Sequence, residues 1–265
     1  MNSLHEYLQA DPECRDLAVG AVLAVGPLLE DPDPALLSRV LDEWAFELAG
    51  RMPLPWSIHG AIDALNHYLF QEQGLQGDRE TFDDPDNAVL PRVVARRRGL
   101  PVTLSILWIA VARRLGLDAF GVGLPGHFIT GLRLDLGALY FDPFHGGLPV
   151  GDEEAARLVR RSTGGRIVFD PLMLEPLPHR EILARLLKNL HARFLRSQQW
   201  DEAFWTATHL ILLSPADPLP HRDRAFVRLR RGEAVEALRD LQEAIRLSPD
   251  AEAQIMDWME RMKKG

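Results

Sequence analysis

The first 75 residues repeat apolar side chains with the period of an α-helix. Asp33-Pro34 is typical of a helix start. The residues that follow it place apolar side chains on one face, namely Leu36, Leu37, Val40, Leu41, Trp44, Ala45 and Leu48. A second run has the same spacing, with Ile58, Ile62, Leu65, Leu69 and Phe70. Glycines then break the pattern, so we expect an N-terminal helical part over residues 1–75.

The next segment predicts two helices with a short break between them. Residues 82–87 form a cluster of turn residues, and we expect a helix from Asp86 or Asn87 to a C-cap at Gly99. Pro101 then suits the first position of the following helix, where its missing N–H costs nothing. That second helix is apolar on nearly all sides, which predicts that it is buried.

Beyond residue 116 the pattern changes to short runs typical of β-strands. These runs cover residues 119–123, 128–134 and 138–141, and Asp135-Leu136-Gly137 suits a hairpin connection. One helix followed by three strands predicts an α+β core, with a small antiparallel sheet packed on the helix that Pro101 begins.

The C-terminal part is helical and contains an internal repeat. Ser214-Pro215 recurs as Ser248-Pro249, a spacing of 249 − 215 = 34 residues. Glu202-Ala203 recurs as Glu236-Ala237 in the same frame. This period, with small residues inside the helices, is typical of tetratricopeptide repeats. We therefore divide the chain into residues 1–75, a core over 76–177, and repeat-like helices over 178–265.

Composition and charge narrow the classes of partner. The net charge of −8 argues against nucleic-acid binding. Apolar runs long enough to cross a membrane are missing from the sequence, so we expect no membrane partner. The single cysteine, Cys14, excludes an intrachain disulfide and fits a cytoplasmic location, with a structural or incidental role for its thiol. The nine histidines show no metal-binding spacing, so we expect no metal and no cofactor.

Three positions follow the order of a papain-like or transglutaminase-like Cys-His-Asp site. Pro101 begins a helix where the cysteine would stand, followed by His127 and Asp142. Proline offers no nucleophile, so standard acyl transfer through position 101 is excluded. Pair counting from a tight hairpin places His127 opposite residue 145 or 146, so meeting Asp142 requires a bulge or a longer turn.

Each candidate also has a plain structural interpretation. His127 suits a capping or core histidine, and Asp142 suits an Asp-Pro turn. His145 is either a substrate-facing loop residue or a solvated turn histidine. Thr103 is an alternative nucleophile only if the start of its helix faces the sheet, and a first-turn threonine usually bonds to local backbone.

Several stretches together resemble bacterial transglutaminase-like proteins with C-terminal tetratricopeptide repeats, sometimes described as invasion-regulator-like. The matching stretches are residues 66–70, 84–87, 98–105, 112–117, 123–128 and 141–147. The resemblance implies a helical N-terminal part, a central helix packed on an antiparallel sheet, and then the repeats. It also implies that His127 and Asp142 occupy the histidine and aspartate positions of the family, with Pro101 at the cysteine position.

These features favour a non-catalytic, transglutaminase-like module that binds a protein or peptide, or regulates one. We expect the contacts to come from a groove near His127 and from the repeat surface. Candidate binding residues are Pro101, His145 and Asn87. The alternative is a hydrolase or acyltransferase that uses His127 and Asp142 with water or Thr103 as the nucleophile. The sequence leaves the oligomeric state open.

Overall fold

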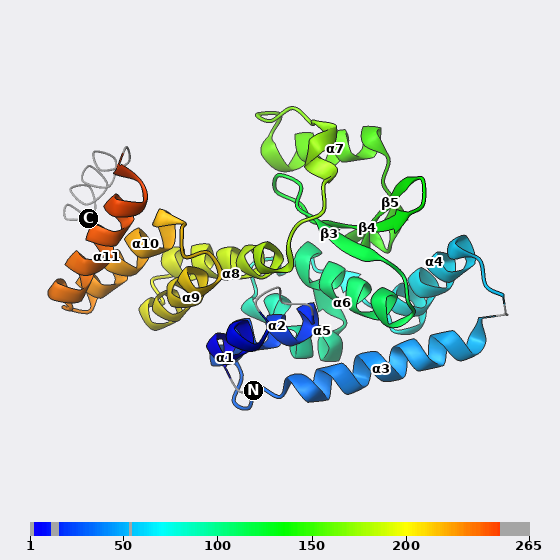
Figure 1. The fold of residues 1–265 in the computed structure, drawn as a ribbon, viewed down its shortest axis with the longest axis horizontal. Helices are drawn as coiled ribbons and strands as arrows, with labels where there is room; N and C mark the ends of the chain where they lie inside the picture. Colours follow the sequence, from blue (N-terminus) through cyan, green and yellow to red (C-terminus); the bar gives the residue numbers. More distant parts are fainter. Residues whose placement is uncertain (1–2, 12–15, 53–54, 250–265) are drawn as a thin grey trace. The chain divides into compact units, whose positions relative to one another are not determined.

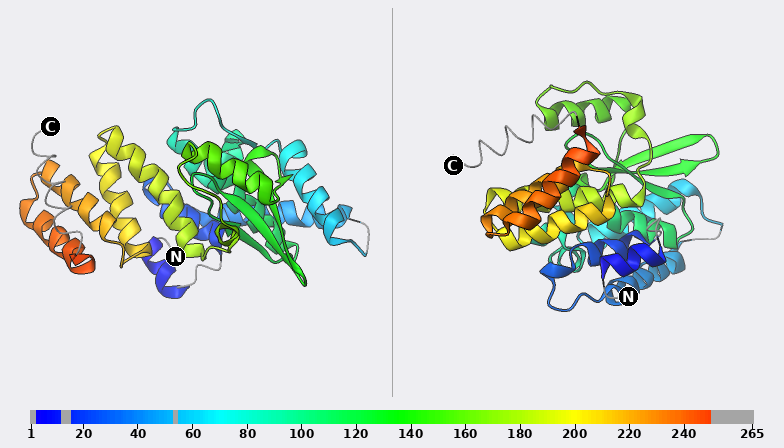
Figure 2. Two further views of the ribbon diagram at one scale, coloured as in Figure 1. Left: turned by 90° about the horizontal axis from the view of Figure 1, so that it is seen from above. Right: turned by 60° about the vertical axis from the view of Figure 1, so that its left-hand side comes forward.

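The computed structural model describes residues 3–11, 16–52 and 55–249 (Figures 1 and 2). Cys14 lies outside these residues. The chain separates into two compact units, Met1–Leu186 and Leu187–Gly265, and helix α8 (His179–Arg196) crosses the boundary between them. The helices of 1–75 and the core of 76–177 belong to the first unit, and the domain limits drawn from the sequence remain predictions.

The N-terminal helices begin where side-chain caps satisfy free backbone N–H groups. The helices are α1 (Leu4–Ala10), α2 (Leu17–Ala24), α3 (Pro34–Arg51) and α4 (Ile58–His67), and a π-helical turn over Tyr68–Glu72 continues α4. The carboxylate of Asp33 accepts hydrogen bonds from the N–H groups of Ala35 and Leu36, which confirms the predicted start of α3. Most of the predicted apolar face of α3 is buried, whereas Leu36 on that face is 55% exposed.

The helix expected from Asp86 or Asn87 begins later than the sequence predicts. Residues Pro85–Ala88 form a 3-10 turn, η3, and helix α5 covers Leu90–Arg96. The left-handed residue after α5 is Arg97, with φ 61°, rather than Gly99. Gly99 is needed for space instead, because a Cβ there would lie 2.8 Å from the hydroxyl of Thr103.

Helix α6 (Pro101–Arg114) is the centre of the first unit, and Pro101 occupies its first position as predicted. Every residue from Pro101 to Ala112 is buried. The helix contacts α3, strands β3 (Ala119–Val122) and β4 (Ile129–Leu134), and the 3-10 turn η4 (Pro143–His145). The predicted burial of this helix on all sides is therefore confirmed.

The core contains an antiparallel sheet of four strands, which confirms the predicted α+β class. Its order is β3-β4-β5-β6, with β5 over Gly137–Asp142 and the short edge strand β6 over Leu148–Pro149. Residues Leu134 and Gly137 pair, so Asp135-Leu136 forms the predicted hairpin connection. A separate parallel pair joins β1 (Gln76–Gly77) to β2 (Arg98–Gly99).

Helix α7 (Asp152–Thr163), which the sequence analysis did not predict, covers the face of the sheet opposite α6 (Figures 1 and 2). Its buried side chains Ala155, Leu158 and Val159 pack with Val122 and Ile129 of the sheet. The sheet thus lies between α6 and α7. This packing holds the ends of its strands in place, and polar side chains lie at these ends.

In the described residues of the second unit, successive helices pack against one another. They are the end of α8, α9 (Trp200–Leu213), α10 (Pro218–Arg230) and α11 (Ala234–Leu247). The repeat-equivalent residues Ala203 and Ala237 are both fully buried. Small side chains at these positions let neighbouring helices approach closely, as the 34-residue period predicts.

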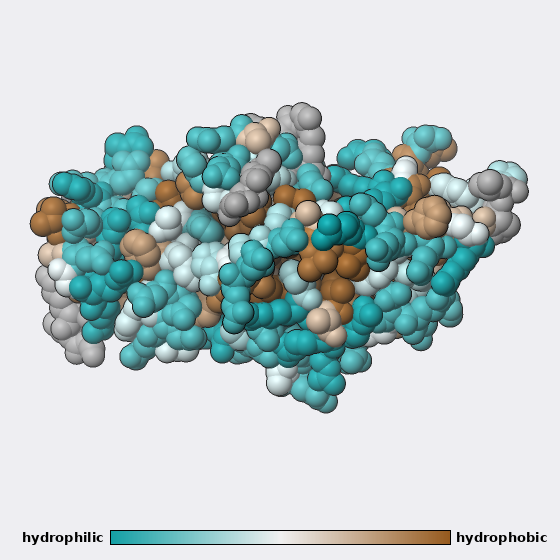
Figure 3. All heavy atoms as spheres, turned by 90° about the horizontal axis from the view of Figure 1, so that it is seen from below, coloured by the Kyte–Doolittle hydropathy of each residue, from teal (hydrophilic) through white to brown (hydrophobic). Residues whose placement is uncertain are grey.

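The surface combines hydrophilic areas with small hydrophobic ones, as the face in Figure 3 shows. Among the described residues, none of the helices is long and apolar enough to cross a lipid bilayer.

Candidate functional site

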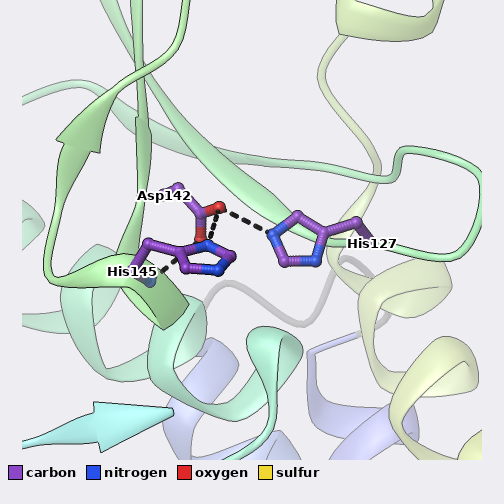
Figure 4. A group of neighbouring side chains, drawn as sticks. All are labelled: His127, Asp142 and His145. Carbon is purple, nitrogen blue, oxygen red and sulfur yellow. Dashed lines mark hydrogen bonds and ion pairs between the residues drawn. The ribbon is translucent and has the colours of Figure 1, made fainter. Parts of the chain in front are cut away.

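Asp142 is the centre of a buried polar cluster at the end of strand β5. Its Oδ1 atom accepts hydrogen bonds from the backbone N–H groups of Phe144 and His145, at 3.0 and 3.3 Å. Its Oδ2 atom lies 2.8 Å from Nε2 of His127 and 2.7 Å from Nδ1 of His145 (Figure 4). The structure therefore brings two histidines, 18 residues apart in the chain, onto one carboxylate oxygen.

The strand register explains how His127 reaches Asp142. Thr130 pairs with Phe141, and extending this register places His127 opposite residue 144, two positions beyond Asp142. The expected pairing of His127 with residue 145 or 146 is therefore wrong by one or two positions, and the hairpin contains no bulge. His127 precedes strand β4 by two residues, so its side chain is free to turn toward the carboxylate.

An arginine that the sequence analysis did not identify holds the loop before His127. The Nη2 atom of Arg185, in α8, donates hydrogen bonds to the carbonyl oxygens of Leu124 and His127, at 2.6 and 2.8 Å. The guanidinium also lies 5.7 Å from the centre of the Phe128 ring. Burial lowers the pKa of Arg185. Its role in the structure is to fix the backbone that presents His127.

Aromatic contacts restrict the two imidazoles. The ring of Phe144 lies edge-on to both, with centroids 6.0 Å from His127 and 5.3 Å from His145. Gly77 also lies against Phe144, where an added Cβ would come 2.6 Å from the Phe144 carbonyl oxygen. The Phe144 ring therefore limits the positions that the two imidazoles can take beside Asp142.

The electrostatics of the cluster favour an ionised Asp142. Burial alone would raise the pKa of this carboxyl, but the hydrogen bonds from His127 and then His145 outweigh it, and the pKa falls well below its usual range. A carboxylate only accepts hydrogen bonds, so the ring nitrogens that face it carry the hydrogens. In neutral rings, Nδ1 of His127 and Nε2 of His145 are then the basic nitrogens.

The candidate residues around Pro101 are enclosed. Pro101 is buried at the start of α6, and the hydroxyl of Thr103 is fully buried. That hydroxyl accepts a hydrogen bond from the N–H of Leu100 and lies 2.9 Å from the carbonyl oxygen of Asn87. Among the described residues, no hydrogen bond joins Thr103 to His127. Thr103 is therefore engaged as a helix cap and is poorly placed to act as a nucleophile.

Asn87 stabilises the loop that precedes α5. Its side chain is fully buried, and Nδ2 donates to Asp78 and to the carbonyl oxygen of Thr81, at 3.0 and 2.7 Å. Burial would raise the pKa of Asp78, but hydrogen bonds from Thr81 and Asn87 lower it to about 2. This arrangement leaves Asn87 no exposed group for a ligand.

A groove of about 980 Å³ opens beside Asp142 and His145. Its other walls are Arg79, strand β6 with the residues that follow it, and the first turns of α7. The side chain of His145 is 26% exposed, whereas that of His127 is 10% exposed. His145 is therefore the member of the cluster that a bound molecule reaches most easily.

A second link fixes the chain just after η4. The indole Nε1 of Trp108, in α6, donates to Oδ1 of Asn66 at 2.8 Å, and Nδ2 of Asn66 donates to the carbonyl oxygen of Gly147 at 3.1 Å. Asn66 thus connects α4, α6 and the segment that leads into β6. Asn66 belongs to residues 66–70, the first stretch that resembles the transglutaminase-like family, and this resemblance is the signal in the sequence that marks it.

Comparison with known proteins agrees with this architecture. A sequence model described as the transglutaminase-like superfamily matches residues 36–188, and a tetratricopeptide-repeat model matches residues 190–262. A UPF0162 protein of Xylella fastidiosa is 41% identical over 189 residues, which cover 70% of this chain and 67% of the relative.

More distant matches cover more of the chain. A UPF0162 protein of Pseudomonas aeruginosa is 31% identical over 223 residues, which cover 84% of this chain and 81% of the relative. A crystal structure of menin, with 11% identity, has a TM-score of 0.37 and covers 93% of this chain and 70% of menin, a likeness too low for any inference. The superfamily match covers more than half of the sequence, and the chain therefore belongs to the transglutaminase-like superfamily, as a bacterial-type member with C-terminal tetratricopeptide repeats.

Proposed function

We propose that this protein is a non-catalytic binding module, in which the transglutaminase-like core holds a peptide or protein segment. The observation that carries the proposal is Pro101, which begins α6 at the position where the family resemblance places a cysteine. Its side chain supplies no nucleophile, while His127 contacts Asp142 and a groove opens beside Asp142 and His145. A superfamily core together with repeat helices forms a module capable of protein interaction.

The groove has the mixed lining that a peptide requires. Leu148, on edge strand β6, is 60% exposed and offers an apolar contact. Arg79 and the acidic first turn of α7 supply charges of both signs along the same groove. An extended segment placed along an edge strand gains backbone hydrogen bonds, and side-chain pockets provide specificity.

Selection from a displayed random-peptide library, with the full chain immobilised, tests this proposal. We expect enriched peptides to lose binding to a Leu148→Asp variant. A Leu136→Asp variant is the matched control, because Leu136 is 98% exposed at the hairpin tip and lies outside the groove. If no peptide is enriched, or if Leu148→Asp binds as well as the control, the peptide-binding proposal fails.

A separate measurement tests the proposed lack of acyl-transfer activity. Amine incorporation into glutamine-containing peptides, and hydrolysis of amides and esters, should proceed equally slowly with the wild type and with His127→Ala. A rate that depends on His127 would overturn the non-catalytic proposal.

Hydrolysis is a second candidate function, because His127 is hydrogen-bonded to Asp142. The 2.8 Å contact between His127 and Asp142 leaves Nδ1 of the imidazole as a base that is able to activate water. A water nucleophile fits better than Thr103, whose hydroxyl is buried within a helix cap. An ester or amide that the wild type cleaves, and that His127→Ala leaves intact, would favour this alternative.

We also propose that the repeat helices contribute protein contacts and that the protein is cytoplasmic. Apolar side chains of α11 are open to solvent, with Val235 64% and Leu238 56% exposed. The single cysteine of the chain fits a reducing compartment. Fractionation of cells that express the full chain tests the location.

A further inference from the structure

Three potential metal ligands converge at the polar cluster. One donor atom from each of His127, Asp142 and His145 lies within 4.8 Å of the other two. We propose that these side chains bind one divalent transition-metal ion of the zinc class, through Nε2 of His127, Oδ2 of Asp142 and Nδ1 of His145. Two imidazoles and one carboxylate form a donor set that suits Zn²⁺ and Co²⁺ better than Mg²⁺ or Ca²⁺.

The carboxylate is oriented for this role by the backbone. Two N–H groups hold Oδ1 of Asp142, so Oδ2 is the oxygen that faces both histidines (Figure 4). Outer contacts of this kind fix ligand orientation in metal sites. Arg185 holds the loop of His127 by two carbonyl oxygens, and Phe144 restricts both rings. These neighbours therefore hold the three donor side chains close together before an ion binds.

Metal binding at these atoms balances in protons and charge. Each neutral histidine moves its ring hydrogen from the nitrogen that faces Asp142 to its other nitrogen, by exchange with water. No proton is released overall, because the carboxylate is already ionised and the rings stay neutral. One anionic ligand then leaves a net charge of +1 at the site.

The geometry requires only a small separation of the ligands. Metal–ligand bonds of about 2.0–2.2 Å put neighbouring tetrahedral donor atoms roughly 3.4 Å apart. The two nitrogens lie 2.8 and 2.7 Å from Oδ2, so the pairs open by about 0.6 and 0.7 Å when the hydrogen bonds are exchanged for metal bonds. Rotation of the partly exposed His145 ring supplies part of this movement.

The site is open to solvent and incompletely coordinated. Asp142 and His145 line the groove of about 980 Å³, which gives an ion a path to the ligands. Three protein ligands leave a fourth position for water or for a donor group of a bound molecule, the pattern of zinc sites that are not purely structural.

The test is a titration of the full, tag-free chain with Co²⁺, after treatment with a chelator, followed by visible absorption. We expect one equivalent to bind with the spectrum of a low-symmetry nitrogen and oxygen site, and Zn²⁺ to displace it. His145→Ala should weaken binding by more than about 100-fold, since loss of even an outer-shell partner costs roughly 10–100-fold. His127→Ala should have the same effect.

Two control variants separate this site from adventitious binding. His67→Ala removes a histidine whose side chain is 66% exposed on α4, and Cys14→Ser removes the thiol. Both should bind Co²⁺ like the wild type. Absence of saturable binding, or equal affinity in wild type and His145→Ala, overturns the proposal. If His127→Ala does not give a native circular dichroism spectrum, the more exposed His145 decides the outcome. Peptide selection does not enter this test, so the metal site and the proposed binding function succeed or fail separately.

Discussion

His145 approaches the same oxygen of Asp142 that His127 contacts, with Nδ1 2.7 Å from Oδ2. Asp142 therefore accepts four hydrogen bonds, two from imidazoles and two from backbone N–H groups. In the family layout an aspartate orients one histidine. In this chain it orients two, and the second lies at the groove. This sharing makes Asp142 the residue on which the cluster depends most.

Replacement of Asp142 by alanine should destabilise the protein in a pH-dependent way. At pH 7 the free energy of unfolding should fall by about 3 kcal/mol, because two N–H groups and two imidazoles lose a buried acceptor. The folded-state pKa of Asp142 is lowered, so its stabilisation is present above the unfolded value of about 3.9 and is lost as the pH falls below it.

Urea unfolding at pH 7, 5, 4 and 3 measures this effect. The difference between wild type and Asp142→Ala should narrow below about pH 4. Asp118→Ala is the control, because its exposed ion pair with Arg133 should contribute little at any pH. A difference that stays constant from pH 7 to pH 3 contradicts the prediction.

Replacement of Gly126 by alanine should loosen the loop that presents His127. Gly126 has φ 73°, and an added Cβ would lie 2.6 Å from the Cβ of Ser162. Backbone strain of about 1–2 kcal/mol and the steric clash should both lower the melting temperature. Gly116→Ala is the matched control, because it has φ 80° and open space around the new Cβ. Equal losses in the two variants would show that the contact with Ser162 has no effect.

Introduction of cysteine at position 101 tests whether the family layout is preserved. In a Cys14→Ser background, the Pro101→Cys thiol would lie at the first position of a 14-residue helix, where the dipole lowers a thiol pKa below about 8.5. If His127 lies beside this position, its removal should slow alkylation by iodoacetamide several-fold. The measurement is the alkylation rate against pH. The same rate with and without His127 would show that position 101 is not part of the site.

The second unit depends on a buried carboxylate of its own. Asp240 is 4% exposed and accepts two hydrogen bonds from Arg224, at 2.7 and 2.9 Å, and one from Arg228 at 2.8 Å. Asp240→Asn should destabilise α10 and α11 by about 3 kcal/mol, because it leaves two arginines without their buried counter-charge.

Hydrogen exchange of the full chain checks this prediction locally. Exchange should accelerate in residues 218–247 and stay unchanged in the sheet. Glu243→Gln, which removes an exposed partner of Arg246, should leave exchange as in the wild type. Acceleration spread over the whole chain would contradict a local effect.

Most of the fold was predicted from the helical spacing of apolar residues. Caps such as Asp33 and the buried stripe of α3 are local features, so the sequence predicts them well. Helix α7 has the same kind of signal, with Ala155, Leu158 and Val159 on one face, and its spacing was sufficient to find it. Strand β6 has only two residues, one of them a proline, and pairs only because β5 lies next to it.

The C-cap of α5 shows why local signals also mislead. A glycine after a helix normally marks the left-handed residue, yet Arg97 takes that conformation and Gly99 is required by the approach of Val93 and Thr103. The pattern correctly marked a helix end near this glycine, but the reason for the glycine is the close packing of α5 and α6 on either side of it.

The sequence by itself determined that position 101 offers no nucleophile and that the C-terminal part contains a repeat. Proline at position 101 has no nucleophilic atom in any fold, and a 34-residue period is a property of the chain alone. Only the tertiary structure decided that His127 and His145 share one oxygen of Asp142. That sharing depends on strand register, on the 3-10 turn after β5 and on the loop held by Arg185. Contacts between residues 15–18 positions apart are set by the packing of a whole sheet, which no local pattern records.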